Sequence, residues 1–254
     1  MRFRVKAFGL HLLGSACALS LVLGVLYLGW YRWPGWYLSS ALHIVGIVVM
    51  VDLVLGPTLT LIVASAGKPR RELTRDIGMI VVVQLAALIY GGYTLWSGRP
   101  LYYAFSVNCL EMVQASDIEA DERTLAHQQN PSFAPRWSSL PRWIWAPLPE
   151  NKEAANKIVS GTLFGGKDVI EMPRYFRPWN QGLPKLREQL TPVNNLIFLT
   201  KEERKAMSAR MAARGLRPDA HNVLIMWGGS RRLVAVFDPA TLQLQALLNP
   251  DLIS

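Results

Sequence analysis

The residue best placed to do chemistry is Asp52, which lies in an apolar stretch at about 41–64. If that stretch crosses a membrane, an ionised carboxylate inside it costs about 3 kcal/mol. Gly56 and Pro57 follow, and a proline inside a helix removes a backbone hydrogen bond and can kink the helix. A membrane acid relays protons, docks a partner or holds helices together. A relay needs further acids at other depths, and the apolar stretches contain none, so packing or docking is favoured.

Polar side chains of the second and third apolar stretches are expected to face one another. Equal counting outward from residue 71, in the loop between the two stretches, pairs their positions by depth. The expected contacts join Asp52 to the Tyr90 hydroxyl, and Gln84 to Thr58 or Thr60. Pro57 should add an acceptor by freeing the carbonyl of Leu53, one turn earlier. Such contacts stabilise helix pairs in membranes by about 0.6–2 kcal/mol each.

Other motifs give weaker indications of chemistry. The segment Gly-Thr-Leu-Phe-Gly-Gly-Lys-Asp at 161–168 has the glycines and lysine of a phosphate-binding loop. It has Asp168 where that loop has Ser or Thr, and no convincing strand precedes it. The four histidines show no metal-ligand spacing, and no nucleophile motif occurs. The sequence therefore predicts no enzymatic activity, no cofactor and no metal site.

Three apolar stretches must position the polar residues, at about 8–30, 41–64 and 77–96. Each approaches or exceeds the ~20 residues that a helix needs to cross a bilayer. Charged residues and a proline mark their boundaries: Lys68, Arg75, Asp76, Arg99 and Pro100. Basic residues are concentrated before the first stretch and in the loop 66–76, so the positive-inside rule predicts that both are cytoplasmic. In a bacterium this predicts a multi-pass inner-membrane protein whose later residues lie in the periplasm.

We therefore expect a membrane protein with a three-helix transmembrane bundle at 1–98 and a small periplasmic α+β domain at 99–254. Segments 101–107 and 110–114 predict a hairpin or a bulged strand, and 222–248 predicts a three-stranded β-meander. Thr200 and Glu203 form a capping-box pattern that begins a helix to about residue 214.

The prolines of this domain predict irregular segments. Five prolines at 130–150 are expected to exclude a regular helix or a central strand. That segment is either an ordered loop packed by its own tryptophans or a loop that binds a partner or the membrane surface. Residues 175–192 are also expected to be irregular, apart from a short helix at 186–190.

The net charge of +9 arises from 27 basic and 18 acidic residues. In a soluble protein this excess would suggest nucleic acid. In this chain the flanks of membrane helices explain much of it, so the lipid bilayer is an expected partner and nucleic acid is not. Cys17 and Cys109 fall inside and outside the membrane, so no disulfide is expected.

Several motifs in the first part of the chain resemble those of the TfpX/TfpZ-type type IV pilin accessory family. The resemblance covers residues 1 to about 115, and its motifs are Lys-Ala-Phe-Gly-Leu-His-Leu-Leu at 6–13, Val-Asp-Leu-Val-Leu-Gly-Pro-Thr-Leu-Thr-Leu at 51–61, Gly67-Lys68, Arg75-Asp76, Gln-Leu-Ala-Ala-Leu-Ile-Tyr-Gly at 84–91 and Arg99-Pro100. The chain departs from the family pattern at Asn108-Cys109.

The resemblance implies an inner-membrane protein that helps a cognate type IV pilin accumulate or assemble, without enzymatic activity. Its partners would be the membrane helix and the periplasmic head of that pilin. The alternative is a membrane-anchored periplasmic sensor or binding module. Because the expected cytoplasmic segments are short, such a sensor would act through another partner.

Overall fold

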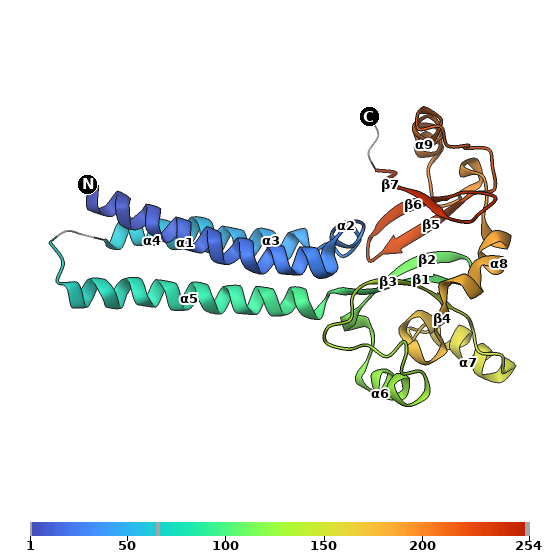
Figure 1. Ribbon diagram of the computed structural model, residues 1–254, viewed down its shortest axis with the longest axis horizontal. Helices are drawn as coiled ribbons and strands as arrows, with labels where there is room; N and C mark the ends of the chain where they lie inside the picture. The colour runs from blue at the N-terminus through green and yellow to red at the C-terminus, as the bar shows by residue number, and fades with distance from the viewer. Residues whose placement is uncertain (1, 65–66, 252–254) are drawn as a thin grey trace. The chain divides into compact units, whose positions relative to one another are not determined.

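The computed structural model describes residues 2–64 and 67–251. The chain divides into two compact units, Met1–Arg99 and Pro100–Ser254 (Figure 1). Residue 66 of the predicted loop 66–76 lies outside the described residues. So do the outermost ends of the predicted domains 1–98 and 99–254.

Three long apolar helices make up the first unit. Their elements are α1 (Arg2–Leu26), the π-helical turn η1 (Tyr27–Tyr31), the short α2 (Gly35–Leu38), α3 (Leu42–Val49), the π-helical turn η2 (Met50–Leu55), α4 (Gly56–Val63) and α5 (Arg70–Ser97). The continuous spans Arg2–Tyr31, Leu42–Val63 and Arg70–Ser97 are long and apolar enough to cross a membrane. Large apolar side chains such as Leu10, Val82 and Ile89 are exposed on these helices. Exposed apolar side chains of this kind are typical of helices that face lipid.

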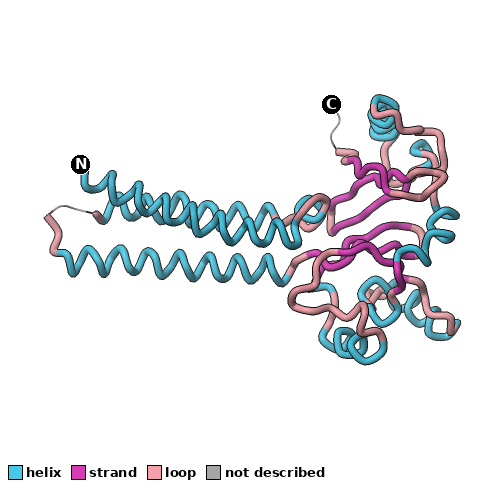
Figure 2. The backbone as a smooth tube through the Cα atoms, in the orientation of Figure 1, coloured by secondary structure: helices cyan, strands magenta, loops and turns pink. Residues whose placement is uncertain are grey.

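A seven-stranded sheet organises the second unit, and its strands are magenta in Figure 2. The strand order is β4-β3-β1-β2-β5-β6-β7. The strands are β1 (Pro100–Ser106), β2 (Cys109–Gln114), β3 (Arg142–Ala146), β4 (Arg177–Pro178), β5 (Val223–Gly228), β6 (Arg231–Phe237) and β7 (Leu244–Leu248). β1 pairs with β3 in parallel, and so does β2 with β5, whereas the other neighbours are antiparallel. The β2–β5 pairing therefore joins the hairpin and the meander into one sheet.

Helices cover this sheet over two hydrophobic clusters. The helices are α6 (Ala120–Gln129), α7 (Lys152–Leu163), α8 (Trp179–Gln189) and α9 (Lys201–Ala213). One cluster gathers around Tyr102, Ile144 and Phe176, and the other contains Met207 and Met211 of α9 packed with strands β5 and β6. Strands β1 and β5 are apolar along most of their length because both of their faces are buried.

Several predicted elements are confirmed. The 101–107 and 110–114 segments form the β1–β2 hairpin, with an irregularity between Pro100 and Tyr102. Helix α9 begins at the predicted capping box, in which the Thr200 hydroxyl accepts from the Glu203 N–H and the Glu203 carboxylate accepts from the Thr200 N–H. The C-terminal meander is formed by β5, β6 and β7.

Two predictions for this unit are wrong. Strand β3 lies inside the sheet between β4 and β1, in the segment where prolines were expected to exclude a central strand. Pro141 and Pro147 flank β3 directly, so neither interrupts its ladder. Helix α8 occupies much of the region expected to be irregular and contains Pro184. Leu186 of this helix is fully buried, so tertiary packing stabilises α8 although Pro184 disfavours a helix locally.

Candidate functional site

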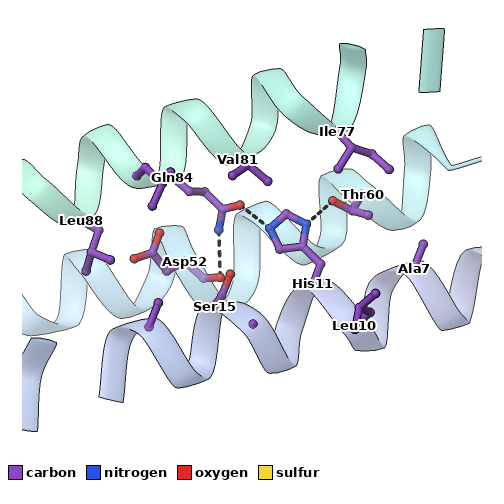
Figure 3. A pocket seen from close by; sticks show the side chains of 13 residues that line it. Ala7, Leu10, His11, Ser15, Asp52, Thr60, Ile77, Val81, Gln84 and Leu88 are labelled. Atoms are coloured by element: carbon purple, nitrogen blue, oxygen red, sulfur yellow. Dashed lines mark hydrogen bonds between the residues drawn. The ribbon is translucent and has the colours of Figure 1, made fainter. Parts of the chain in front are cut away.

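A chain of polar side chains joins the three long helices of the first unit (Figure 3). His11 of α1 lies between two partners: its Nδ1 is 2.5 Å from Thr60 Oγ1 of α4, and its Nε2 is 2.6 Å from Gln84 Oε1 of α5. The Gln84 Nε2 in turn donates to the backbone carbonyl of Asp52 at 3.0 Å. Thr60, Gln84 and Asp52 are all buried, so the network lies inside the bundle.

The direction of these hydrogen bonds follows from their chemistry. A backbone carbonyl only accepts, so the Gln84 amide nitrogen must face Asp52 and the amide oxygen must face His11. His11 Nε2 therefore carries a proton and donates it to that oxygen. In a neutral imidazole Nδ1 then accepts from the Thr60 hydroxyl, which completes a one-way chain from Thr60 to the Asp52 backbone.

The π-helical turn explains why the carbonyl of Asp52 accepts this bond. The N–H of Gly56 bonds to the carbonyl of Val51, five residues earlier, which is the spacing of a π-helix. Five residues before Pro57 is Asp52, and Pro57 has no N–H to offer it. The expectation that Pro57 frees the carbonyl of Leu53 assumed α-helical spacing of four residues, whereas the acceptor that Gln84 uses is the carbonyl of Asp52, five residues before Pro57.

Gly56 gives Gln84 the space to reach this carbonyl. A Cβ atom built on Gly56 would lie 2.0 Å from Gln84 Nε2 and 2.2 Å from Oε1. Any larger residue at this position must displace the amide that links His11 to Asp52. The pair Gly56-Pro57 therefore acts on the site twice, since the glycine admits the Gln84 side chain and the proline leaves it an acceptor.

The carboxylate of Asp52 takes no part in the chain. Its side chain is only 3% exposed, and neither oxygen has a hydrogen-bond partner among the described residues. It lines a pocket of about 400 Å³ together with Thr60 and Gln84. The remaining lining comes mainly from apolar or small residues of α1 and α5: Ala7, Leu10, His11, Gly14, Ser15, Ala18, Ile77, Val81, Leu85 and Leu88. A buried polar group without a partner is costly, so this carboxyl group is available to a ligand.

Two of the predicted contacts are wrong. Tyr90 is 74% exposed and does not meet Asp52, and Thr58 is exposed and does not meet Gln84. The depth count ignored rotation about the helix axis. The buried positions of α5, such as Gln84 and Gly91, are seven residues apart and share a face, whereas Tyr90 lies off that face. The alternative partner, Thr60, is buried but reaches Gln84 through His11.

His11 is the site residue that the sequence pattern did not reveal, because histidines were considered only as metal ligands. A signal was present. Equal counting outward from the middle of the turn 31–40 places His11 level with Thr60. A polar residue in each of three apolar stretches is itself typical of a buried interhelical network.

The boundary residues form local contacts. Lys68 pairs with Asp76 at the start of α5, and Arg75 Nε lies 3.6 Å from the same carboxylate. Arg99 is buried, with its guanidinium carbon 4.1 Å from the ring centre of Trp96, and it donates to the Trp96 carbonyl. Pro100 is the first residue of β1.

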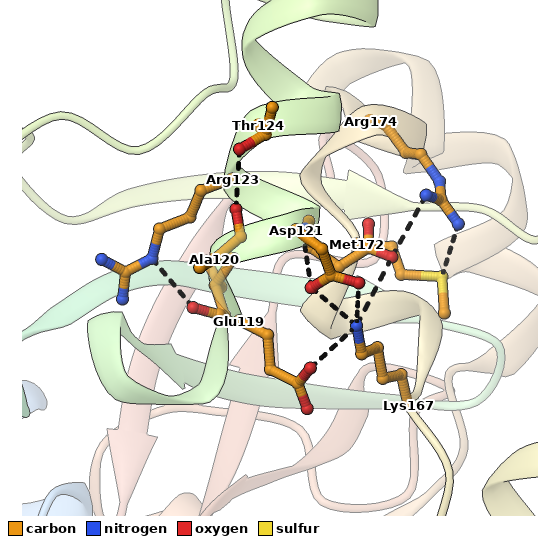
Figure 4. A network of polar contacts seen from close by, with 10 residues as sticks. Glu119, Ala120, Asp121, Arg123, Thr124, Lys167, Met172 and Arg174 are labelled. Atoms are coloured by element: carbon orange, nitrogen blue, oxygen red, sulfur yellow. Dashed lines mark hydrogen bonds and ion pairs between the residues drawn. The ribbon is translucent and has the colours of Figure 1, made fainter.

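The glycine-rich segment 161–168 contains the last residues of α7 and the turn that follows, and its lysine is engaged by acids. Lys167 Nζ lies 2.6 Å from Asp121 and 3.0 Å from Glu119 (Figure 4). These pairs raise the pKa of Lys167 and lower that of Asp121, each chiefly through their mutual hydrogen bond. Among the described residues, no group of three or more His, Cys, Asp or Glu could hold a metal ion.

The sequence is similar to fimbrial assembly proteins of Dichelobacter nodosus. It is 27% identical to the serogroup I protein over 194 residues, which cover 75% of this chain and 73% of the relative, and the serogroup E1 protein matches to the same extent. The protein of serogroups C1 and C2 is 29% identical over 120 residues, or 47% of this chain and 92% of that relative. No family model and no solved structure matches the chain. These similarities support a relationship to a fimbrial assembly family.

Proposed function

We propose that this chain is a non-enzymatic accessory protein of type IV pilus assembly, of the TfpX/TfpZ type. The similarity to fimbrial assembly proteins supports the role in assembly. The role of each part is our own inference: the bundle receives the membrane helix of a cognate pilin, and the second unit holds or orients the pilin head. The protein would stand in the bacterial inner membrane with a cytoplasmic N-terminus and a periplasmic second unit.

One observation carries the proposal for the bundle, namely the buried carboxyl group of Asp52 beside a pocket of about 400 Å³. The His11–Gln84 chain already ties the three helices together, so the Asp52 side chain is not needed for that purpose. Ionisable side chains within membrane segments usually pair with another polar group. The carboxyl group of Asp52 would therefore find its partner on a molecule that enters the pocket.

The residues that line the pocket favour a helix as the occupant. On α1 its lining includes Gly14, Ser15 and Ala18, and such small residues let a neighbouring helix approach closely. On α5 the lining is larger and apolar, as at Val81 and Leu88. An apolar helix that carries one hydrogen-bonding group would cover both surfaces and satisfy Asp52.

Co-purification tests this proposal. The tagged chain is extracted in mild detergent from cells that make the cognate pilin, and the bound pilin is measured against the amount of chain recovered. The wild-type chain should retain the pilin, and Asp52→Leu should lose most of it. Tyr90→Phe is the matched control, because Tyr90 is an exposed polar residue of the bundle outside the pocket.

Two outcomes would count against the proposal. Equal pilin recovery with Asp52→Leu and wild type would remove the pocket from the interaction. Unchanged pilin levels and pilus number after deletion of the gene would remove the accessory role altogether.

A further inference from the structure

The segment between α6 and β3 exposes large apolar side chains. Trp137 is 76% exposed and Leu140 is 59% exposed, so the tryptophans of this segment do not all pack inside it. Trp143 differs, since it packs against Tyr103 and Trp179 within the sheet region. The interpretation of 130–150 as a loop packed by its own tryptophans therefore fails at Trp137.

Two arginines lie near these side chains, since Arg136 precedes Trp137 in the sequence and both Arg136 and Arg142 line a hollow with Leu140. Arg136 and Arg142 line a polar hollow of about 310 Å³ with Ser132 and Ser139. The Arg142 guanidinium is held in place by a hydrogen bond of 2.6 Å to the Ser132 carbonyl and by the Phe133 ring at 4.6 Å. No acidic residue occurs between Glu122 and Glu150 in the sequence, so the charged residues near the hollow, Arg136 and Arg142, are both basic.

Chain connectivity keeps this segment close to the end of α5. Strand β1 begins at Pro100, three residues after α5 ends at Ser97. β1 and β3 run in parallel with Tyr102 opposite Arg142, so the residues that lead into β3 lie at the end of the sheet where β1 begins. Five residues of chain, from Ser97 to Tyr102, reach at most about 18 Å. If α5 crosses a membrane, the start of β1 is therefore tethered within about 18 Å of the end of that helix, and the residues that lead into β3 lie beside it.

We infer that residues 136–142 form a membrane-surface contact, in which Trp137 and Leu140 enter the interface and the hollow at Arg136 and Arg142 receives an anionic lipid headgroup. Tryptophan is enriched at the membrane–water interface because its ring is amphipathic. Arginine binds phosphate through paired donors, and basic residues near the membrane are attracted to anionic lipids. This contact does not depend on which protein the bundle binds.

A fluorescent reporter on the full chain tests the inference. Cys17→Ser and Cys109→Ser leave the chain without native thiols, and Leu140→Cys then carries an environment-sensitive dye. Val107→Cys is the matched control, because Val107 is 61% exposed in the turn at the other end of β1. Both proteins are placed in lipid nanodiscs of phosphatidylcholine alone or with phosphatidylglycerol.

We expect the dye at 140 to shift its emission to the blue and to be quenched by headgroup spin-labelled lipid, more strongly with phosphatidylglycerol. The dye at 107 should do neither. Arg136→Gln should reduce the preference for phosphatidylglycerol at 140. Hydrogen exchange of amides 136–140 in the unmodified chain should slow when phosphatidylglycerol is added, which checks the result without the cysteine changes.

Three outcomes would overturn the inference. One is a dye at 140 that stays in water in both lipids. Another is a dye at 140 that is protected only after a pilin is added, which would assign the surface to a protein. The last is release of the dye at 140 by millimolar inorganic phosphate, which would assign the hollow to a free anion.

Discussion

The side-chain amide of Gln84 on α5 donates a hydrogen bond to the backbone carbonyl of Asp52 on η2, with 3.0 Å between nitrogen and oxygen. A proline would ordinarily weaken its helix at this point, because Pro57 cannot supply the backbone donor. In this bundle a neighbouring helix supplies the donor instead. The interruption of the second helix therefore becomes a link between the second and third helices.

Replacing Thr60 with valine should loosen the polar chain. Thr60→Val keeps the side-chain shape but removes the hydroxyl group that contacts His11. We expect a loss of about 1 kcal/mol in the free energy of unfolding, which is typical of one interhelical hydrogen bond. Unfolding in mixed micelles at increasing dodecyl sulfate measures this change. Thr58→Val is the control, because Thr58 is exposed on the same helix, and equal losses in the two variants would contradict the network.

Adding a methyl group at Gly56 should displace Gln84. The new Cβ atom would lie 2.0 Å from the Gln84 amide nitrogen, so Gly56→Ala must move a hydrogen-bonded side chain. Overpacking of this kind costs about 1–3 kcal/mol. Thermal unfolding in detergent would measure the loss. Gly46→Ala lies in the same span with open space around it, and it should leave the midpoint nearly unchanged.

Glu111 of β2 should make stability depend on pH. Burial raises the pKa of the Glu111 carboxyl above its ordinary value, against a lowering by the Cys109 thiol, and the charge of Asp168 adds to the rise. The folded chain therefore holds this proton more tightly than the unfolded chain, so the ionised form destabilises the fold at neutral pH. As pH falls through the raised pKa, this penalty disappears.

Glu111→Gln has no such titration, so it should be more stable than wild type at pH 7. The difference should shrink as the pH falls toward about 4, the ordinary range of a glutamate. Urea unfolding at several pH values measures it. Glu150→Gln replaces an exposed glutamate of the same unit and serves as the control. A Glu111→Gln variant that is less stable than wild type at pH 7 and approaches it on acidification would show that the Glu111 pKa is lowered by folding rather than raised.

The capping box of α9 should account for local stability of that helix. Thr200→Ala removes the oxygen that accepts from the Glu203 N–H, and loss of an N-cap costs about 0.5–2 kcal/mol. Thr200→Ser keeps that oxygen and should lose much less. Hydrogen exchange of the α9 amides in the full chain reports the change. If serine and alanine exchange equally fast, the hydroxyl is not the cap.

Local patterns were enough to predict many elements of this chain. Apolar stretches of sufficient length predict the three long helices, and short runs rich in aromatic and aliphatic residues, separated by turn signals, predict the β1–β2 hairpin and the meander. These predictions succeed because each depends on residues close together in the sequence. The prediction for 130–150 was wrong because the place of β3 inside the sheet depends on its pairing with β1. The partner residues in β1 lie about forty positions earlier in the sequence.

The sequence by itself determined that the polar residues of the bundle require partners, because an apolar surrounding makes isolated polar groups costly. It also indicated that Pro57 removes a backbone hydrogen bond from its helix and leaves a carbonyl group open one turn earlier. Only the tertiary structure decided the partners, since depth along a helix says nothing of rotation about its axis. It placed His11 between Thr60 and Gln84, turned Tyr90 outward and left the Asp52 carboxyl group in a pocket. It also showed a π-helical turn at 50–55, beside which the carbonyl of Asp52 accepts its hydrogen bond from Gln84 on another helix.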